Sequence, residues 1–152
     1  MNIVQPLKSS NLPPSRKKRS IFNRLLSYFP AMMFASLFGT YSDLYFVGKG
    51  AYEFPARPFA GIFHVNIAFT LIALPLLTVC FLNFVKRLER WKRWAIIALV
   101  SAAAPAAERI AEQLGLFRHG EAWSHAYSFF GYLFFLSIIW KMYKWTITAR
   151  KL

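Results

Sequence analysis

Four long apolar stretches, separated by short polar segments, dominate the sequence. They cover about residues 25–47, 59–85, 94–117 and 123–145. Each reaches the twenty or so residues that an α-helix needs to cross about 30 Å of hydrocarbon. Tryptophans stand near the ends of the last two stretches, where a membrane interface favours them. The pattern predicts an all-α integral membrane protein, a four-helix bundle with short loops.

Prolines add detail to these predicted helices. Proline is favoured at the first position of a helix, so Pro30 indicates that the first crossing begins there, with residues 21–29 along the interface. Pro75 lies inside the second stretch and predicts a kink, which a membrane helix tolerates when its neighbours satisfy the freed carbonyl. Pro105 lies near the middle of the third stretch.

The first twenty residues are polar and basic, and we predict that 1–20 form a disordered cytoplasmic tail before a single transmembrane domain at 21–148. The following apolar stretch is too long for a signal peptide and lacks a clear small-residue cleavage site. It is therefore expected to remain as an anchor. A basic run in the tail is expected to contact anionic lipid headgroups. Its members are Arg16, Lys17, Lys18 and Arg19.

Composition favours a bilayer as the solvent of the outer surface. Hydrophobic residues make up 57% of the chain and charged residues only 16%, against about 25% charged in typical soluble domains. The net charge of +13 does not indicate nucleic-acid binding, because the basic residues are confined to segments between the apolar stretches. The positive-inside rule accounts for that distribution.

The distribution of lysine and arginine gives the orientation. Six precede residue 25, five lie in 86–93 and four in 141–151, whereas the two remaining loops carry three together. Four crossings with both termini inside place all three basic groups on the cytoplasmic side. A three- or five-helix interpretation would place one of them outside. The predicted location is the plasma membrane, with multiple crossings.

Polar residues within the predicted helices gather in the outer half of the bilayer. At about 1.5 Å per residue, Asp43 and Glu112 lie about 10 Å from the midplane and Glu108 about 4 Å. Ionisable groups at such depths are costly and mark candidate functional sites. The predicted intramembrane cluster consists of Asp43, Asn66, Glu108, Arg109, Glu112 and His125. Nearer the outer surface lie His64, His119 and Glu121.

Glu108 and Glu112 are four residues apart and therefore share one helix face. Two like charges so close in a low dielectric cannot both stay ionised cheaply. Arg109, a histidine, a bound cation or a proton is needed to neutralise them.

Three interpretations of the cluster remain open. In the first it is structural, with Arg109 pairing with a glutamate and Asp43 accepting from His125 or Asn66. In the second it is a proton or cation site open to the outside, because three acids face one arginine. In the third, Glu108, Glu112 and His125 hold a metal for an enzyme, with Asp43 or His64 as a further ligand. The spacing E-x-x-x-E is not that of a known metalloprotease motif.

No catalytic motif accompanies this cluster, and the single cysteine, Cys80, excludes an intramolecular disulfide. We therefore expect a small non-enzymatic membrane protein, a structural or accessory component. The alternatives are a proton- or cation-linked channel or transporter subunit and, second, a membrane-embedded metal-dependent enzyme. No cofactor is predicted beyond a proton or cation. The expected partners are the lipid bilayer, anionic headgroups, and further copies or a larger membrane complex, without nucleic acid.

Several segments resemble a family of small four-helix membrane proteins from spore-forming Firmicutes. They are residues 39–43 (GTYSD), 48–58 (GKGAYEFPARP), 108–115 (ERIAEQLG), 123–125 (WSH) and 128–132 (SFFGY). The resemblance implies a Gram-positive plasma membrane whose outer side faces the cell wall, or an intermembrane space during sporulation. It implies no activity.

Overall fold

The computed structural model describes residues 16–121 and 123–150, with side chains for 25–121, 123–124 and 126–150. Four helices form the fold: α1 (Arg16–Gly48), α2 (Leu74–Val85) with the π-helical turn η1 (Phe69–Ala73) before it, α3 (Arg90–Gln113) and α4 (His125–Ala149). Two short strands, β1 (Tyr52–Glu53) and β2 (Arg118–His119), pair at one end. The prediction of an all-α four-helix bundle is confirmed.

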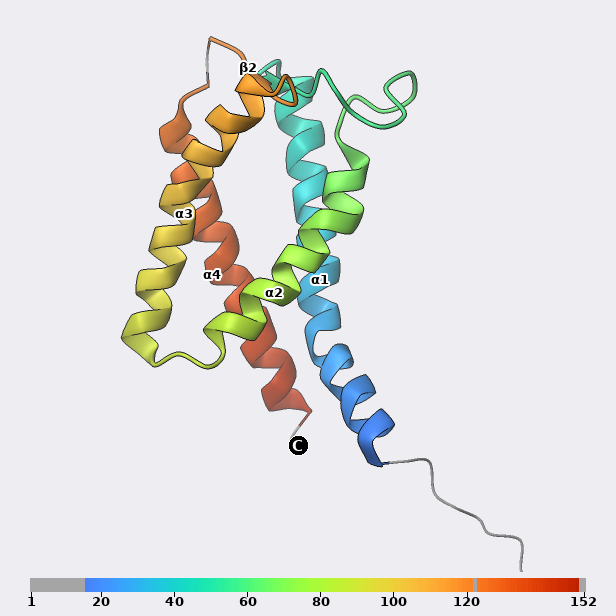
Figure 1. Cartoon of the computed structure of the whole chain (residues 1–152), viewed down its shortest axis with the longest axis vertical. Helices are drawn as coiled ribbons and strands as arrows, with labels where there is room; N and C mark the ends of the chain where they lie inside the picture. Colours follow the sequence, from blue (N-terminus) through green and yellow to red (C-terminus); the bar gives the residue numbers. More distant parts are fainter. Residues whose placement is uncertain (1–15, 122, 151–152) are drawn as a thin grey trace, which may run out of the picture.

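The helices run side by side, and the start of α1 lies at the same end of the bundle as the last turn of α4 (Figure 1). That end also carries the connection between α2 and α3, while β1 and β2 lie at the opposite end. Helix α4 packs against both α1 and α3, and α1 packs against α2. We call the end with β1 and β2 the strand end and the other the terminal end.

One helix of the described chain, α3, is long and apolar enough to cross a membrane by length and composition. The apolar run Phe69–Val85 is shorter. Helices α1 and α4 are long, at 33 and 25 residues, but they contain more tyrosine, serine and lysine than α3.

The second helix begins later than the sequence predicted. A start at 59 was wrong, because the guanidinium of Arg57 donates to the carbonyls of Phe54 (2.5 Å), Ala60 (3.4 Å) and Phe63 (2.6 Å) and so holds the loop in a non-helical shape. Phe59, directly after a proline, has a φ of 55°. The helix begins only where Asn66 Oδ1 accepts from the backbone N–H of Phe69 (3.1 Å), as a capping residue does.

The kink predicted at Pro75 takes the form of a π-helical turn. Proline lacks an N–H and its ring collides with the carbonyl four residues earlier in a regular α-helix. The wider turn of η1, just before Pro75, separates those groups. Pro30, by contrast, starts no new helix, because α1 runs unbroken through it.

The other helix boundaries differ from the predicted ones by several residues. Helix α1 begins at Arg16, inside the segment predicted as a disordered tail, because arginine and lysine are good helix formers. Helix α3 begins four residues before 94 and ends at Gln113, where Gly115 adopts a left-handed φ of 71°. Helix α4 covers His125–Ala149. Residues 1–15 lie outside the described part of the chain.

A basic and aromatic network closes the terminal end, and the sequence did not predict it. Lys86 Nζ donates to the hydroxyl of Tyr28 (2.6 Å), whose ring stacks on Tyr143 with centroids 5.3 Å apart. The guanidinium of Arg93 lies 4.0 Å from the ring centroid of Trp140 and donates to Leu88 O at 2.6 Å. These contacts join all four helices at this end.

Candidate functional site

At the strand end, two loops that are distant in sequence come together. Strands β1 and β2 pair antiparallel, with Tyr52 opposite His119 and Glu53 opposite Arg118. Arg118 Nη1 also lies 3.1 Å from Glu53 Oε1. A Cβ on Gly120 would lie 2.5 Å from Gly50 O, so the approach of the two loops requires a glycine there.

Asp43 and Tyr52 form the first polar contact of the site. The hydroxyl of Tyr52 donates a 2.7 Å hydrogen bond to Asp43 Oδ1. Tyr52 is 8% exposed, and burial raises the pKa of its hydroxyl far above the ordinary value of 10, with the negative charge of Asp43 as the next cause. The hydroxyl therefore stays protonated and remains a donor.

Glu108 on α3 belongs to the same cluster. Its Oε2 accepts a 2.6 Å hydrogen bond from the hydroxyl of Ser128 on α4. Glu108 and Tyr132, one turn after Ser128 on α4, also contribute to the raised pKa of Tyr52, so they lie within electrostatic reach of it. We call Asp43, Tyr52, Glu108, Ser128 and Tyr132 the inner cluster. It connects α1, α3, α4 and β1.

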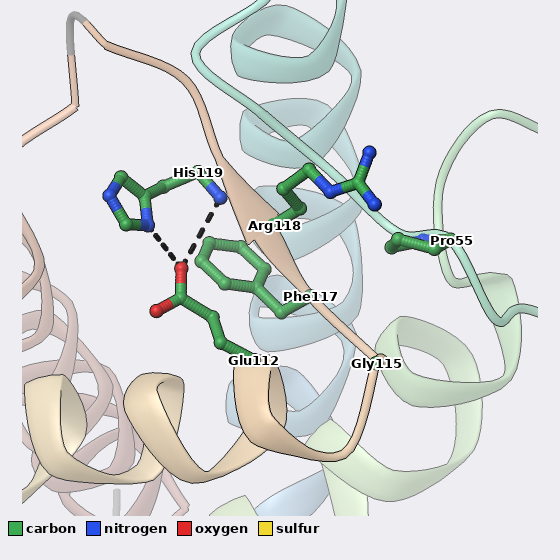
Figure 2. A pocket seen from close by; sticks show the side chains of 6 residues that line it. All are labelled: Pro55, Glu112, Gly115, Phe117, Arg118 and His119. Atoms are coloured by element: carbon green, nitrogen blue, oxygen red, sulfur yellow. Dashed lines mark hydrogen bonds and ion pairs between the residues drawn. The ribbon is translucent and has the colours of Figure 1, made fainter.

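Glu112 forms a second, more exposed cluster one turn further along α3. Its Oε1 is in contact with His119 Nδ1 and accepts from the backbone N–H of His119 at 3.3 Å. Figure 2 shows both contacts beside a hollow of about 280 Å³. The hollow is lined by Pro55, Glu112, Gly115, Phe117, Arg118 and His119. Of the neutralising groups considered from the sequence, a histidine is the one that meets Glu112.

Aromatic rings pack around Tyr52 and cover the inner cluster from the loop side. Trp123 and Phe117 lie 5.1 and 5.2 Å from the Tyr52 ring, centroid to centroid. Trp123 also meets Phe46 of α1 at 5.2 Å. Among the described residues, Trp123 Nε1 and Thr40 Oγ1 are buried polar atoms that have no hydrogen-bond partner. Buried orphan groups of this kind are rare and mark places where a polar ligand or water fits.

The structure divides the predicted cluster. Asp43 and Glu108 come together around Tyr52, and Glu112 joins His119 instead. Asn66 caps the second helix rather than serving Asp43. Arg109 is exposed on α3, and in the part of the chain described here it forms no ion pair with a glutamate. His64 and Glu121 are exposed.

Two predictions fall on side chains that the structure does not describe. One concerns His125 in the cluster, and the other concerns the contacts of residues 16–19 with headgroups. Within the described residues, no group of three or more His, Cys, Asp or Glu side chains is arranged to hold a metal ion.

Sequence reasoning missed Tyr52, Ser128 and Tyr132. A signal for Ser128 was present, because α3 and α4 are consecutive antiparallel helices, which pair residues equally far from the middle of the connection between them. Glu108 and Ser128 are equally distant in sequence from Arg118. Tyr52 gave no such signal, since its position depends on how the loop folds back over α1.

No family model, curated protein or solved structure matches this chain. The resemblance to the family from spore-forming Firmicutes stays a prediction. The fold and site define an all-α four-helix bundle with two polar clusters at one end.

Proposed function

We propose that this chain is a four-span plasma-membrane protein with both termini in the cytoplasm, and that it is a non-enzymatic structural or accessory component. In this proposal the strand end is the outer end, and the inner cluster holds three helices of the bundle in register.

The observation that carries the proposal is the large apolar surface of the bundle, combined with small hydroxyl side chains between its helices. Small hydroxyl side chains are fully buried between helices, with Thr70 1% and Ser101 0% exposed, whereas Leu37, Leu99 and Phe130 are each more than 60% exposed. In water this arrangement leaves a large apolar surface uncovered. In lipid it is the expected packing, because small residues let helices approach closely and large apolar ones face the chains.

Two of the buried hydroxyls bond to carbonyls within their own helices. Thr78 Oγ1 donates to Leu74 O and Ser101 Oγ to Ile97 O, each at 2.8 Å. Helix interfaces in a bilayer need this, because no water is available to bond the groups. Close approach is also present at Gly39, where a Cβ would lie 2.5 Å from Leu74 Cδ2.

Topology is tested by cysteine labelling, since Cys80 is the single native cysteine. In a Cys80→Ala background, a membrane-impermeant maleimide is applied to intact cells carrying Ala56→Cys, Glu121→Cys or Glu89→Cys. We expect labelling at 56 and 121 in intact cells, and at 89 only after permeabilisation. Labelling of 56 and 89 from the same side, or release of the chain by alkaline carbonate, would refute four crossings.

A second candidate function is proton or cation coupling through the inner cluster. It is favoured by the hydrogen bond between Tyr52 and Asp43, by the electrostatic influence of Glu108 on the pKa of the same tyrosine, and by the orphan polar atoms of Thr40 and Trp123. In proteoliposomes, proton or cation flux that is lost in Glu108→Gln but kept in Glu89→Gln would support it. Flux at background level in the wild-type protein would exclude this second function, and the structural role would stand.

A further inference from the structure

The terminal end has a hollow between α1 and α4 that the inner cluster does not involve. Its volume is about 360 Å³, and it is lined by Pro30, Met142, Trp145, Thr146, Ala149 and Arg150. This is near the lower limit of small-molecule sites, roughly 300–1,000 Å³. The space suits part of one hydrocarbon chain rather than a whole lipid.

Five of the six lining residues present carbon-rich surface. The hydroxyl of Thr146 donates to Met142 O at 2.9 Å, so its hydrogen bond is made inside α4. Proline at position 30 gives α1 a compact, rigid side chain at this point. The walls therefore favour an apolar occupant.

Arg150 is the one charged residue of the lining, and it stands at the end of α4. Its Nη1 donates to Ser27 Oγ on α1 at 3.2 Å, which holds the guanidinium beside the hollow. Guanidinium groups bind phosphate through paired N–H donors. Because Arg150 follows the last turn of α4, it lies where the apolar part of the chain meets the cytoplasmic interface in the proposed topology.

The surroundings favour an anion. Of the six acidic residues of the whole sequence, five belong to the strand end and its loops. Glu89 alone lies at the terminal end, and its carboxylate pairs with Lys92 at 3.2 Å. Lys141 and Lys144 are exposed on the same part of α4.

We propose that this hollow is a binding site for an anionic phospholipid of the cytoplasmic leaflet, with one acyl chain against Met142, Trp145 and Ala149 and the phosphate at Arg150. The site rests on the proposed membrane topology. It differs from general attraction of basic residues to the bilayer surface, because it requires an apolar groove and the guanidinium of Arg150 beside it.

Trp145 provides a direct probe, since it lines the hollow. The protein is reconstituted in vesicles that contain brominated phosphatidylglycerol or brominated phosphatidylcholine, whose bromines quench tryptophan on contact. The contribution of Trp145 is the difference between the wild type and Trp145→Phe. We expect phosphatidylglycerol to be preferred about fivefold at this position, the size of one basic side chain's attraction to an anionic membrane.

Three variants separate a built site from an ordinary interfacial tryptophan. Arg150→Gln should reduce the preference to about one, while Lys144→Gln, which loses the same charge outside the lining, should keep it. Ala149→Phe should fill the hollow and lower quenching by both lipids. Equal quenching of the wild type by the two lipids, or a preference unchanged in Arg150→Gln, would overturn the proposal.

Two further outcomes are distinguished by the same experiment. If soluble glycerol phosphate abolishes the quenching by the anionic lipid, the ligand of Arg150 is a free phosphate and the lipid site is rejected. The cysteine labelling at 56 and 89 reports the topology independently. A chain that spans the membrane without a lipid preference therefore loses the site but not the proposed function.

Discussion

Tyr52 lies on a short strand outside α1 and donates its hydroxyl to Asp43, which is on the last turns of that helix, at 2.7 Å. The contact turns the loop back onto the helix from which it came. It also supplies a carboxylate with a donor that burial keeps protonated. The inner cluster depends on this pair, because the ring of Tyr52 is the surface on which the other aromatic side chains of the loops pack.

Removal of this hydroxyl should destabilise the fold. In Tyr52→Phe, Asp43 loses a buried donor, and we expect the free energy of unfolding to fall by about 1–3 kcal/mol. Denaturant titration in detergent micelles measures it. Tyr41→Phe is the matched control, because Tyr41 is on the same helix as Asp43 and is 74% exposed.

A double-mutant cycle tests the pairing itself. Asp43→Asn and Tyr52→Phe together should cost less than the sum of the single changes, by about 1 kcal/mol, since both remove one interaction. Strict additivity would show that the two side chains are not coupled.

The bond between Glu108 and Ser128 should be worth more than other serine bonds of α4. Ser128→Ala leaves a part-buried carboxylate without this donor, and we expect a loss of about 1–3 kcal/mol. Ser137→Ala is the control, because the Ser137 hydroxyl donates only to Leu133 O within its own helix. Equal losses in the two variants would contradict an interhelical role for Ser128.

Gly39 and Gly131 should respond oppositely to alanine. Alanine is favoured over glycine in a helix by about 0.5–1 kcal/mol, and at Gly131 no described atom lies within 4 Å of the new Cβ. At Gly39 the Cβ would lie 2.5 Å from Leu74 Cδ2, and Leu74 is itself in the core. We expect Gly39→Ala to destabilise the protein by about 1 kcal/mol or more, as overpacking does.

Those two stabilities are measured by the same denaturant titration. In a Leu74→Ala background, Gly39→Ala should lower the free energy of unfolding less than it does in the wild type, because the side chain with which the new Cβ collides is absent. Stabilisation by Gly39→Ala would show that α1 and α2 are less close than described.

The four helices followed from the sequence because each is a long apolar run with a separate polar boundary. The helix starts followed less well where side chains decide them. The bonds of Arg57 to three carbonyls keep 59–66 out of the helix, and hydropathy carries no information on such bonds. At Asn66 a polar residue in an apolar run was assigned to a membrane site, whereas it caps a helix.

The position of the polar residues along the bundle was more predictable than their partners. Asp43, Glu108 and Glu112 do lie toward one end of the bundle, because antiparallel helices bring together residues at the same height. Their partners Tyr52 and His119 are on loops, whose folding depends on contacts between distant segments rather than on periodicity. Lys86 and Tyr28 at the terminal end are 58 residues apart, and no local pattern joins them.

Arg93 should not be replaceable by lysine. Its guanidinium stacks on Trp140 and donates to the carbonyls of Val85 (3.2 Å) and Leu88 (2.6 Å), so it ties the end of α2 to α3 and α4. A lysine keeps the charge but has no planar group that stacks and donates sideways at once. We expect Arg93→Lys to lower the free energy of unfolding by about 1–2 kcal/mol.

Arg90→Lys is the control, since Arg90 is an exposed residue one turn earlier in α3. It should change stability by less than about 0.5 kcal/mol. Because both substitutions preserve the positive charge of the terminal end, the proposed membrane orientation should be the same in each, and cysteine labelling at position 89 checks this. If Arg93→Lys were as harmless as Arg90→Lys, the role of Arg93 would reduce to its charge, and the connection of α2 to α3 would need another cause.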